Sequence, residues 1–357
     1  MRILFVFNHP APYKVNLLNE LSIYHKIDVI FERKKNSNRP KDFYYKEEYH
    51  FNQKFIKGLP FGDENIFSLE LKTFIKNNHK NYDLIIMNGY STLAEIIAIK
   101  YMIKNKIPYA LYINGGVIKK DSKPKLKFKR KLISNAFCYF SPSKKADEYL
   151  IHYGASPKDI HHYVYSTIYK EEIYYGNNKK HISSINEMNF VTFGQFISRK
   201  NNMQLLEISK QFGLKLTLIG SGVEEQKYRD YINDNNISHL VSIKPFLKHS
   251  DLLKELRNYD CFITLSKEDI YGHMINEALS QGLPTICSNK IVSAYKLINK
   301  ESGIMVNIDS NLDIESALNY IFNNYENFKC QSISEQNTIE AMIESHLTIL
   351  KEMEKWN

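Results

Sequence analysis

The sequence predicts an α/β protein made of two doubly wound domains. Short apolar runs with strand character alternate with segments of helical spacing along the chain, which is typical of parallel sheets covered by helices. The 357 residues exceed what one hydrophobic core usually fills and so indicate two domains. A polar stretch of low periodicity, 166–188, is interpreted as the linker between them.

The first domain is expected over residues 1–165. Its predicted strands are 2–7, 27–31, 83–87, 109–113, 137–140 and 162–165. Helical spacing falls between them at 14–24 and 92–104. Sheets of this kind bind ligands at the carboxyl ends of their strands, so the loops at 8–13, 88–91 and 114–117 are expected to contact a ligand.

The second domain is expected over residues 189–334. Its predicted strands are 190–193, 214–219, 241–246 and 261–265, and its predicted helices are 203–211, 223–235 and 274–281. The helix at 274–281 is closed by Gly282 and Pro284, which favour a helix end. The last segment, 335–357, is predicted to be helical.

Two carboxylates stand eight positions apart in the segment 266–288. Asp269 follows an apolar strand, Gly272 permits close backbone approach, and Glu277 lies one turn into the next helix. N–H groups at the start of a helix favour a pyrophosphate, and a carboxylate accepts hydrogen bonds from vicinal sugar hydroxyls. The pattern suits a sugar nucleotide, and the alternative is a solvated acidic loop before an ordinary amphipathic helix.

This segment resembles the E-x7-E signature of retaining glycosyltransferases with the GT-B fold, family 4, also called glycosyltransferase group 1. The positions in register with that signature are Gly272, Glu277, Ala278, Gly282 and Pro284. Two positions depart from it, since Asp269 replaces a glutamate and Ile270 replaces a glycine. The resemblance implies two Rossmann-like doubly wound domains facing a central cleft, with the final helix crossing back to the N-terminal domain.

A second stretch resembles the family's G-R-x-x-x-x-K-G turn, whose basic residues bind the donor diphosphate. Gly194 follows a predicted strand and Lys200 fits the lysine position, whereas Gln195 replaces the arginine. Arg199 is expected to supply the missing charge, because a guanidinium suits phosphate oxygens. The alternative is that these two adjacent basic residues are plain surface.

Two further pieces between these motifs resemble the family's second domain. Gly220 lies in a Gly-Ser-Gly turn after a strand, which by itself fits any tight βα turn. Phe246, or the backbone beside it, is expected to contact the nucleobase. The resemblance implies Asp269, Glu277 and Lys200 as catalytic residues. The donor-binding set that it implies is Gly194, Arg199, Lys200, Gly220, Phe246, Gly272, His273, Met274, Ile275 and Glu277.

The predicted function is glycosyl transfer with retention from a nucleoside diphosphate sugar, with UDP as the first choice of nucleotide. The similarity extends to bacterial enzymes of capsule, exopolysaccharide and lipopolysaccharide synthesis, so a hexosyl-type transfer (EC 2.4) to a saccharide or lipid-linked acceptor is expected. No metal is expected, since the lysine and the helix start can carry the phosphate charge. Two alternatives stay open, a sugar-nucleotide epimerase of the same fold and a non-catalytic partner of another transferase.

The acceptor is expected to enter from the first domain. The candidate contacts, from its three strand-end loops, are Asn8, His9, Tyr13, Tyr90 and Asn114. His9 precedes a proline after the first strand and can equally be a structural or exposed histidine. Retention of the anomeric configuration does not require a dedicated base from this domain.

The net charge of +9 is concentrated in the segment 119–131, which begins at Lys119, ends at Lys131 and holds eight basic residues and one acidic residue. Phe128, Leu132 and Ala136 lie at helical spacing beside it, as in a basic amphipathic helix that binds anionic membranes. A solvated helix is the alternative. Nucleic acid is not an expected partner, because the basic run is single and short.

The four cysteines are scattered without metal-ligand spacing, which favours a reducing compartment. No apolar run approaches the roughly 20 residues that cross a bilayer, and the N-terminus reads as a core strand rather than a signal peptide. A cytoplasmic location, at the inner face of the membrane if the basic helix docks there, is the expectation.

Overall fold

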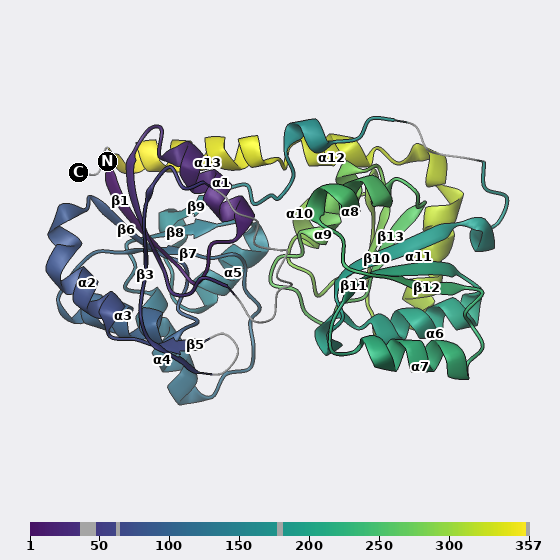
Figure 1. Cartoon of the computed structure of the whole chain (residues 1–357), viewed down its shortest axis with the longest axis horizontal. Coiled ribbons are helices and arrows are strands. Elements are labelled where there is room, and N and C mark those ends of the chain that lie inside the picture. Colours follow the sequence, from purple (N-terminus) through teal and green to yellow (C-terminus); the bar gives the residue numbers. More distant parts are fainter. Residues whose placement is uncertain (36–47, 62–64, 177–180, 355–357) are drawn as a thin grey trace. The chain divides into compact units, whose positions relative to one another are not determined.

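The computed structural model describes residues 1–35, 48–61, 65–176 and 181–354. Its contacts divide the chain into two compact units (Figure 1). The first unit combines Met1–Tyr165 with Ile339–Asn357, and the second unit is Ser166–Thr338. Each unit has its own parallel sheet and its own hydrophobic core.

The first unit is built on a seven-stranded parallel sheet of order β3-β2-β1-β6-β7-β8-β9. Its strands are β1 (Arg2–Phe7), β2 (Lys26–Phe31), β3 (Asn52–Phe55), β6 (Leu84–Met87), β7 (Ala110–Tyr112), β8 (Cys138–Ser141) and β9 (Ile160–His162). The central strand β1 is almost wholly apolar and buried, as expected for a parallel strand covered on both faces. A separate antiparallel hairpin joins β4 (Leu59–Phe61) to β5 (Asn65–Phe67).

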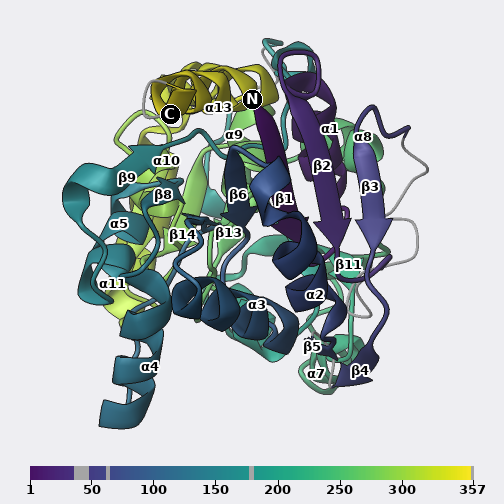
Figure 2. The same ribbon diagram turned by 90° about the vertical axis from the view of Figure 1, so that its left-hand side faces the viewer.

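Helices pack on both faces of this sheet (Figures 1 and 2). The helix α13 lies against α1, while α2, α3 and α4 pack beside one another. The helices of the first unit are α1 (Pro12–Leu21), α2 (Glu70–Asn78), α3 (Leu93–Lys104), α4 (Lys123–Ile133), α5 (Lys144–His152) and α13 (Ile339–Glu354). Short 3-10 turns occur at His79–Asn81 and Pro157–Asp159.

The helix α13 is tied to the first unit by a fully buried histidine. His346 Nδ1 lies 2.6 Å from the Met342 carbonyl oxygen, so Nδ1 carries the proton and donates it. Its Nε2 is then the acceptor for the Tyr112 hydroxyl at 3.2 Å. The ring also stacks against Tyr112 and Phe140. Burial lowers the pKa of His346 to about 4, so this contact is made by the neutral imidazole.

The second unit has a six-stranded parallel sheet of order β12-β11-β10-β13-β14-β15. Its strands are β10 (Asn189–Gln195), β11 (Lys215–Ser221), β12 (Val241–Lys244), β13 (Cys261–Thr264), β14 (Thr285–Ser288) and β15 (Gly303–Val306). Helices α6 and α7 cover one face, and α8 and α9 cover the other (Figure 1), because the chain winds outward from β10 in two opposite directions.

The helices of the second unit are α6 (Asn202–Phe212), α7 (Glu225–Asp234), α8 (His249–Leu256), α9 (Met274–Ser280), α10 (Ala294–Leu297), α11 (Asn311–Asn323) and α12 (Cys330–Glu335). Its short 3-10 turns are η4 (Lys170–Glu172), η5 (Ile185–Glu187), η6 (Ser198–Lys200) and η7 (Tyr325–Asn327). The helix α6 ends at Gly213 in the left-handed conformation, φ +66°, the common way of closing a helix. All four cysteines are free and buried.

The predicted α/β architecture of two doubly wound sheets is confirmed. Several strands differ, since β3, β14 and β15 were not predicted and β9 is Ile160–His162 and not 162–165. The reason for the shift of β9 is that the backbone N–H of Val164 donates to Ser345 Oγ on α13 at 3.0 Å instead of to a strand. The strand β12 ends at Lys244 because Pro245, which follows it, has no N–H to donate.

The stretch interpreted as a linker belongs to the second unit. Ile168 and Met188 are fully buried in the core of that unit. The Ser166 hydroxyl donates to the Asn337 carbonyl oxygen at 2.7 Å. Widely spaced apolar residues in a polar stretch do not reveal such burial. The boundary at the other end also shifts, because α12 ends at Glu335 in the second unit and α13 begins at Ile339 in the first.

Candidate nucleotide-sugar site

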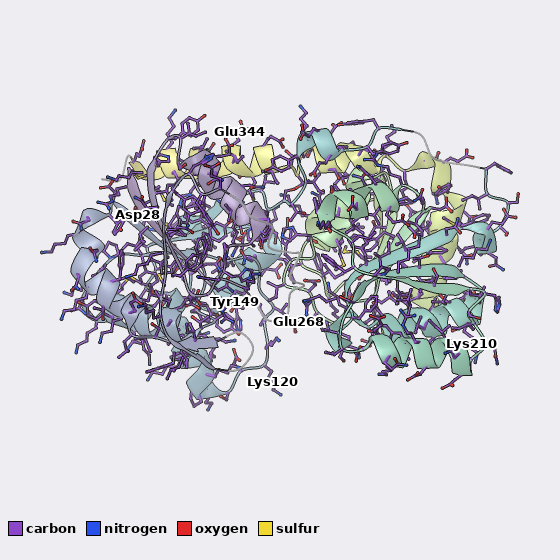
Figure 3. The ribbon with its side chains drawn as sticks, viewed as in Figure 1. Asp28, Lys120, Tyr149, Lys210, Glu268 and Glu344 are labelled. Atoms are coloured by element: carbon purple, nitrogen blue, oxygen red, sulfur yellow. The ribbon has the colours of Figure 1, made fainter. Side chains whose placement is uncertain are left out.

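The candidate site lies in the second unit where β10 and β13 run side by side. Phe190 pairs with Cys261 across these strands. The chain leaves β10 toward β11 and leaves β13 toward β14, so the loops that follow the two strands diverge at their carboxyl ends. Such a switch point is where doubly wound sheets bind ligands. Glu268, labelled in Figure 3, belongs to the loop after β13.

A buried ion pair joins these two loops. Lys200, at the end of η6, donates from Nζ to Asp269 Oδ2. The side chains of Lys200 and Asp269 are only 9% and 12% exposed. Burial raises the pKa of the Asp269 carboxyl, but the Lys200 ammonium outweighs this effect and holds that pKa below its ordinary value. The pair is therefore charged at neutral pH, and it places a cation at the switch point.

Arg199 adds a second positive charge to this edge. Its Nη1 donates to the Glu268 carbonyl oxygen at 3.2 Å and lies 3.6 Å from Asp269 Oδ2. The side chain is 44% exposed, so the guanidinium can reorient toward a ligand. The two cations predicted for the diphosphate thus converge on one carboxylate, which is Asp269.

The turn between Asp269 and α9 requires a glycine. Gly272 has φ +94°, and a Cβ on it would lie 2.4 Å from Ile291 Cγ2, a fully buried side chain. Met274 opens α9, and its Sδ lies 3.8 Å from Lys200 Nζ. The turn therefore brings the start of α9 against the Lys200–Asp269 pair.

The start of α9 also holds two more of the predicted donor contacts, His273 and Ile275. The N–H of Ile275 donates to the Gly272 carbonyl oxygen at 3.2 Å, and its side chain is fully buried in the core. Ile275 therefore has a structural role within the turn. The His273 ring packs against Tyr271, with the ring centroids 4.9 Å apart.

Glu277 lies one turn farther along α9 than Met274, at the i, i+3 spacing that puts both on one side of the helix. Its Oε1 accepts a hydrogen bond from Thr167 Oγ1 at 3.0 Å. His249 Nδ1 lies 3.7 Å from the same oxygen. Within the described residues, Oε2 makes no hydrogen bond or ion pair, so it is open to a ligand.

His249 and Thr167 were not predicted as site residues. Thr167 lies in the stretch interpreted as a linker, and His249 opens α8, far from Glu277 in the sequence. A histidine just after the predicted strand 241–246 was the available signal, since the loops after strands of such sheets hold ligand contacts.

Two predicted glycines meet where β10 and β11 end. Gly194 and Gly220 pair across these strands, and a Cβ on Gly220 would lie 1.9 Å from the Gly194 carbonyl oxygen. Gly220 is thus required for close approach of the two backbones. Phe246 lies in the loop after β12 and is 36% exposed.

The predicted acceptor residues follow β1, β6 and β7 in the first unit, where Asn8 and His9 lie in the loop after β1 and Tyr13 lies in α1. Asn8 Oδ1 accepts a hydrogen bond from the His9 N–H at 3.0 Å, so this asparagine shapes the loop after β1. Tyr13 receives a hydrogen bond from the Tyr165 hydroxyl at 2.9 Å. Tyr90 and Tyr149 hydrogen-bond through their hydroxyls. Among the described residues, Asn114 Oδ1 is enclosed and has no hydrogen-bond partner.

A buried polar group beneath these loops was not predicted. Lys14 is 4% exposed, its Nζ lies 3.4 Å from Asn88 Oδ1 and 4.4 Å from the centre of the Phe7 ring, and burial lowers its pKa to about 7. Glu32 and Glu95 are also buried, and burial with the nearby Glu95 raises the pKa of Glu32 to about 8. The signal in the sequence was the helical spacing of Lys14 with Leu17, Leu18 and Leu21, which places the lysine on the apolar face of its helix.

The basic segment forms α4, with its apolar stripe turned inward. Leu132 and Ile133 are fully buried and Ala136 is 9% exposed, all within the core of the first unit. Most lysines of the segment are exposed, among them Lys120, which Figure 3 labels. The prediction that the apolar face of this helix binds a membrane is therefore corrected, because that face is already covered by the core of the first unit. Only the lysine-rich face is open to an anionic surface.

Within the described ranges, no helix combines the length and the apolar character needed to cross a bilayer.

Part of the chain is similar to a family of known proteins. Residues 177–340 match the model "Glycosyl transferases group 1". The lipopolysaccharide core biosynthesis glycosyltransferase LpsE of Rhizobium meliloti is 26% identical over 33% of this chain and 34% of its own. The uncharacterized glycosyltransferase MJ1178 of Methanocaldococcus jannaschii is 24% identical over 43% of this chain and 44% of its own. These matches span less than half the length of either curated relative.

The solved structures extend the likeness to the whole chain. HepE of Anabaena, crystallised with UDP, has a TM-score of 0.75 at 14% identity and covers 99% of this chain and 100% of its own. An identity this low shows the fold alone. The chain therefore has the GT-B fold, and its residues 177–340 are similar to the glycosyl transferases group 1 family.

Proposed function

We propose that this protein is a retaining glycosyltransferase. It transfers a sugar from a UDP-sugar to a saccharide or lipid-linked saccharide acceptor in bacterial surface polysaccharide synthesis. A hexose is the first candidate for the transferred sugar. The observation that carries the proposal is the meeting of Lys200, Asp269 and the start of α9 at one switch point, with Glu277 one turn along. Further support comes from the LpsE match and from HepE structures that contain UDP or UDP-glucose.

The charges of this group suit a departing diphosphate. As the bond between the sugar and the diphosphate breaks, negative charge grows on the diphosphate, and a cation held in place beforehand stabilises it. Lys200 is held by Asp269, and Arg199 stands at its exposed edge. The diphosphate oxygens would compete with Asp269 for both cations. We propose that these residues, without a divalent metal, carry the phosphate charge.

The rest of the donor is assigned to the two carboxylates. Glu277 Oε2, open to a ligand, accepts hydrogen bonds from the ribose hydroxyls, and Asp269 accepts one from the transferred sugar. The sugar left by the departing diphosphate is oxocarbenium-like, and an acceptor hydroxyl attacks it on the face that the diphosphate left. The acceptor is assigned to the first unit, through Asn8, His9, Tyr13, Tyr90 and Asn114.

The test is incubation with UDP-, GDP-, ADP- and dTDP-sugars, with and without saccharide acceptors, followed by analysis of the nucleotide and sugar products. Transfer predicts nucleotide release that depends on the acceptor, with the anomeric configuration of the donor preserved in the product. Isomerised donor without release would show an epimerase instead. A donor that binds without turnover would support the non-catalytic partner, and an inverted product would exclude retention.

A further inference from the structure

The imidazole of His249 stands between two carboxylates of the second unit. Its Nδ1 lies 3.7 Å from Glu277 Oε1, and its Nε2 lies 3.7 Å from Glu172 Oε2. The histidine side chain is 32% exposed, whereas those of Glu172 and Glu277 are 24% and 14% exposed. These distances allow ion pairing between the protonated imidazole and either carboxylate.

Both carboxylates are themselves held by neighbouring groups. Glu172 Oε2 accepts a hydrogen bond from the Tyr169 N–H at 2.8 Å, and the Glu172 carbonyl oxygen accepts one from Gln281 Nε2 at 2.8 Å. Glu277 Oε1 accepts from Thr167 Oγ1. The η4 turn is thereby fastened to α9, and His249 on α8 is enclosed between them.

The groups that face the imidazole are Glu172 on η4, Glu277 on α9 and the backbone of Thr167. Burial lowers the pKa of His249, but Glu172 and Glu277 together outweigh burial and raise that pKa above its ordinary value. The two carboxylate charges, which stand close together, therefore favour the protonated ring, and the protonated ring neutralises part of both.

We propose that His249 is a positioning residue for donor binding, which as an imidazolium holds Glu277 by one oxygen and presents the other to the ribose. The inference rests on the proposed function, since it takes the ribose of a nucleotide sugar as the partner of Glu277. Loss of the proton leaves two unneutralised carboxylates around a neutral ring, so Glu277 loses its fixed position. Donor affinity then falls as the pH rises through the pKa of His249.

The experiment is calorimetric titration of the full chain with UDP-glucose from pH 5.5 to 8.5. This ligand is chosen because, unlike UDP, it has no phosphate group that titrates in this range. If UDP-glucose does not bind, GDP-, ADP- and dTDP-glucose are screened, and a binder with both ribose hydroxyls is titrated. We expect affinity to fall about tenfold from the acid to the alkaline end. The 2′-deoxy form of the same ligand should show little of this dependence.

Three variants separate positioning from a general structural effect. His249→Gln should bind weakly at all pH values and lose the pH dependence. Glu172→Gln should keep it but move its midpoint to lower pH, because one of the two carboxylates that raise the His249 pKa is removed. The exposed His239 serves as a matched control, and His239→Gln should behave as the unmodified protein. Circular dichroism checks that each variant is folded.

The outcomes distinguish the inference from the proposed function. If a nucleotide sugar binds with the same affinity across the pH range, or if His249→Gln keeps the pH dependence, the positioning role is overturned while the proposed function stands. If no nucleotide sugar binds the unmodified protein, or only dTDP-glucose, whose ribose lacks the 2′-hydroxyl, the ribose assignment of Glu277 fails and the inference fails with it.

Discussion

Lys200 and Asp269 form a buried ion pair that links the loop after β10 to the loop after β13. One member was expected to bind diphosphate and the other the transferred sugar, and the structure shows them bound to each other. The pair therefore holds the two loops together and keeps a cation at the switch point. Each partner is needed to compensate the charge of the other.

Removing only one partner should be costly. Lys200→Met should destabilise the second unit by about 3 kcal/mol or more, because Asp269 is left charged and buried, and should lower turnover at least about 100-fold. The double variant Lys200→Met, Asp269→Asn should regain most of the stability and none of the turnover. Urea unfolding and initial rates check both, with the exposed Lys267→Met as control. Near-normal turnover of Lys200→Met would exclude Lys200 from the diphosphate site.

Glu277→Gln should weaken UDP binding about tenfold or more, because hydrogen bonds to a charged group contribute about 1.5–3 kcal/mol. Calorimetry with UDP measures this, and Glu207→Gln, an exposed position on α6, is the control. The loss should be much smaller with the 2′,3′-dideoxy nucleotide. If Glu277→Gln loses the same affinity for UDP and for the dideoxy nucleotide, Glu277 does not bind the ribose hydroxyls.

Gly272 and Gly89 have nearly the same φ, +94° and +89°, but different surroundings. A Cβ on Gly89 meets nothing within 4 Å, whereas one on Gly272 meets Ile291 at 2.4 Å. Gly89→Ala should therefore cost about 1–2 kcal/mol from the backbone alone. Gly272→Ala should cost more and should also weaken nucleotide binding. If Gly89→Ala and Gly272→Ala lose the same free energy of unfolding, the Ile291 side chain moves aside without an energetic cost.

Acid should weaken the attachment of α13 through His346. The pKa of this histidine is about 4 in the folded protein and about 6.5 when unfolded, so the unfolded state binds the extra proton. Stability is full above pH 6.5 and is lost as the pH falls toward 4. Between pH 7 and 5 the loss is about 2 kcal/mol. Urea unfolding measures the drop in the free energy of unfolding between pH 7 and pH 5, which should be larger in the unmodified protein than in His346→Gln by this amount. If the free energies of both proteins change with pH in the same way, the assignment to His346 is contradicted.

The exposed lysines of 119–131 should bring the protein to anionic vesicles by charge alone, since the apolar stripe of α4 is buried. Each basic residue near such a surface contributes about 1 kcal/mol. Flotation with phosphatidylglycerol vesicles should fall steeply with salt and with Lys119, Lys120, Lys123 and Lys127 changed to Gln. Binding to neutral vesicles, or binding insensitive to salt, would argue against this contact.

The sequence alone determined the two parallel sheets, because continuous apolar strands such as Arg2–Phe7 and helices ended by glycine are local signals. It also determined that Lys200, Asp269 and Gly272 lie in segments that follow strands and that Glu277 lies in the next helix, since motif spacing specifies these positions. The pairing of Lys200 with Asp269, the approach of His249 to Glu277 and the inward stripe of α4 were decided only by tertiary structure. These contacts join residues tens of positions apart or bury a face against distant segments, and no local pattern encodes which distant group a side chain meets.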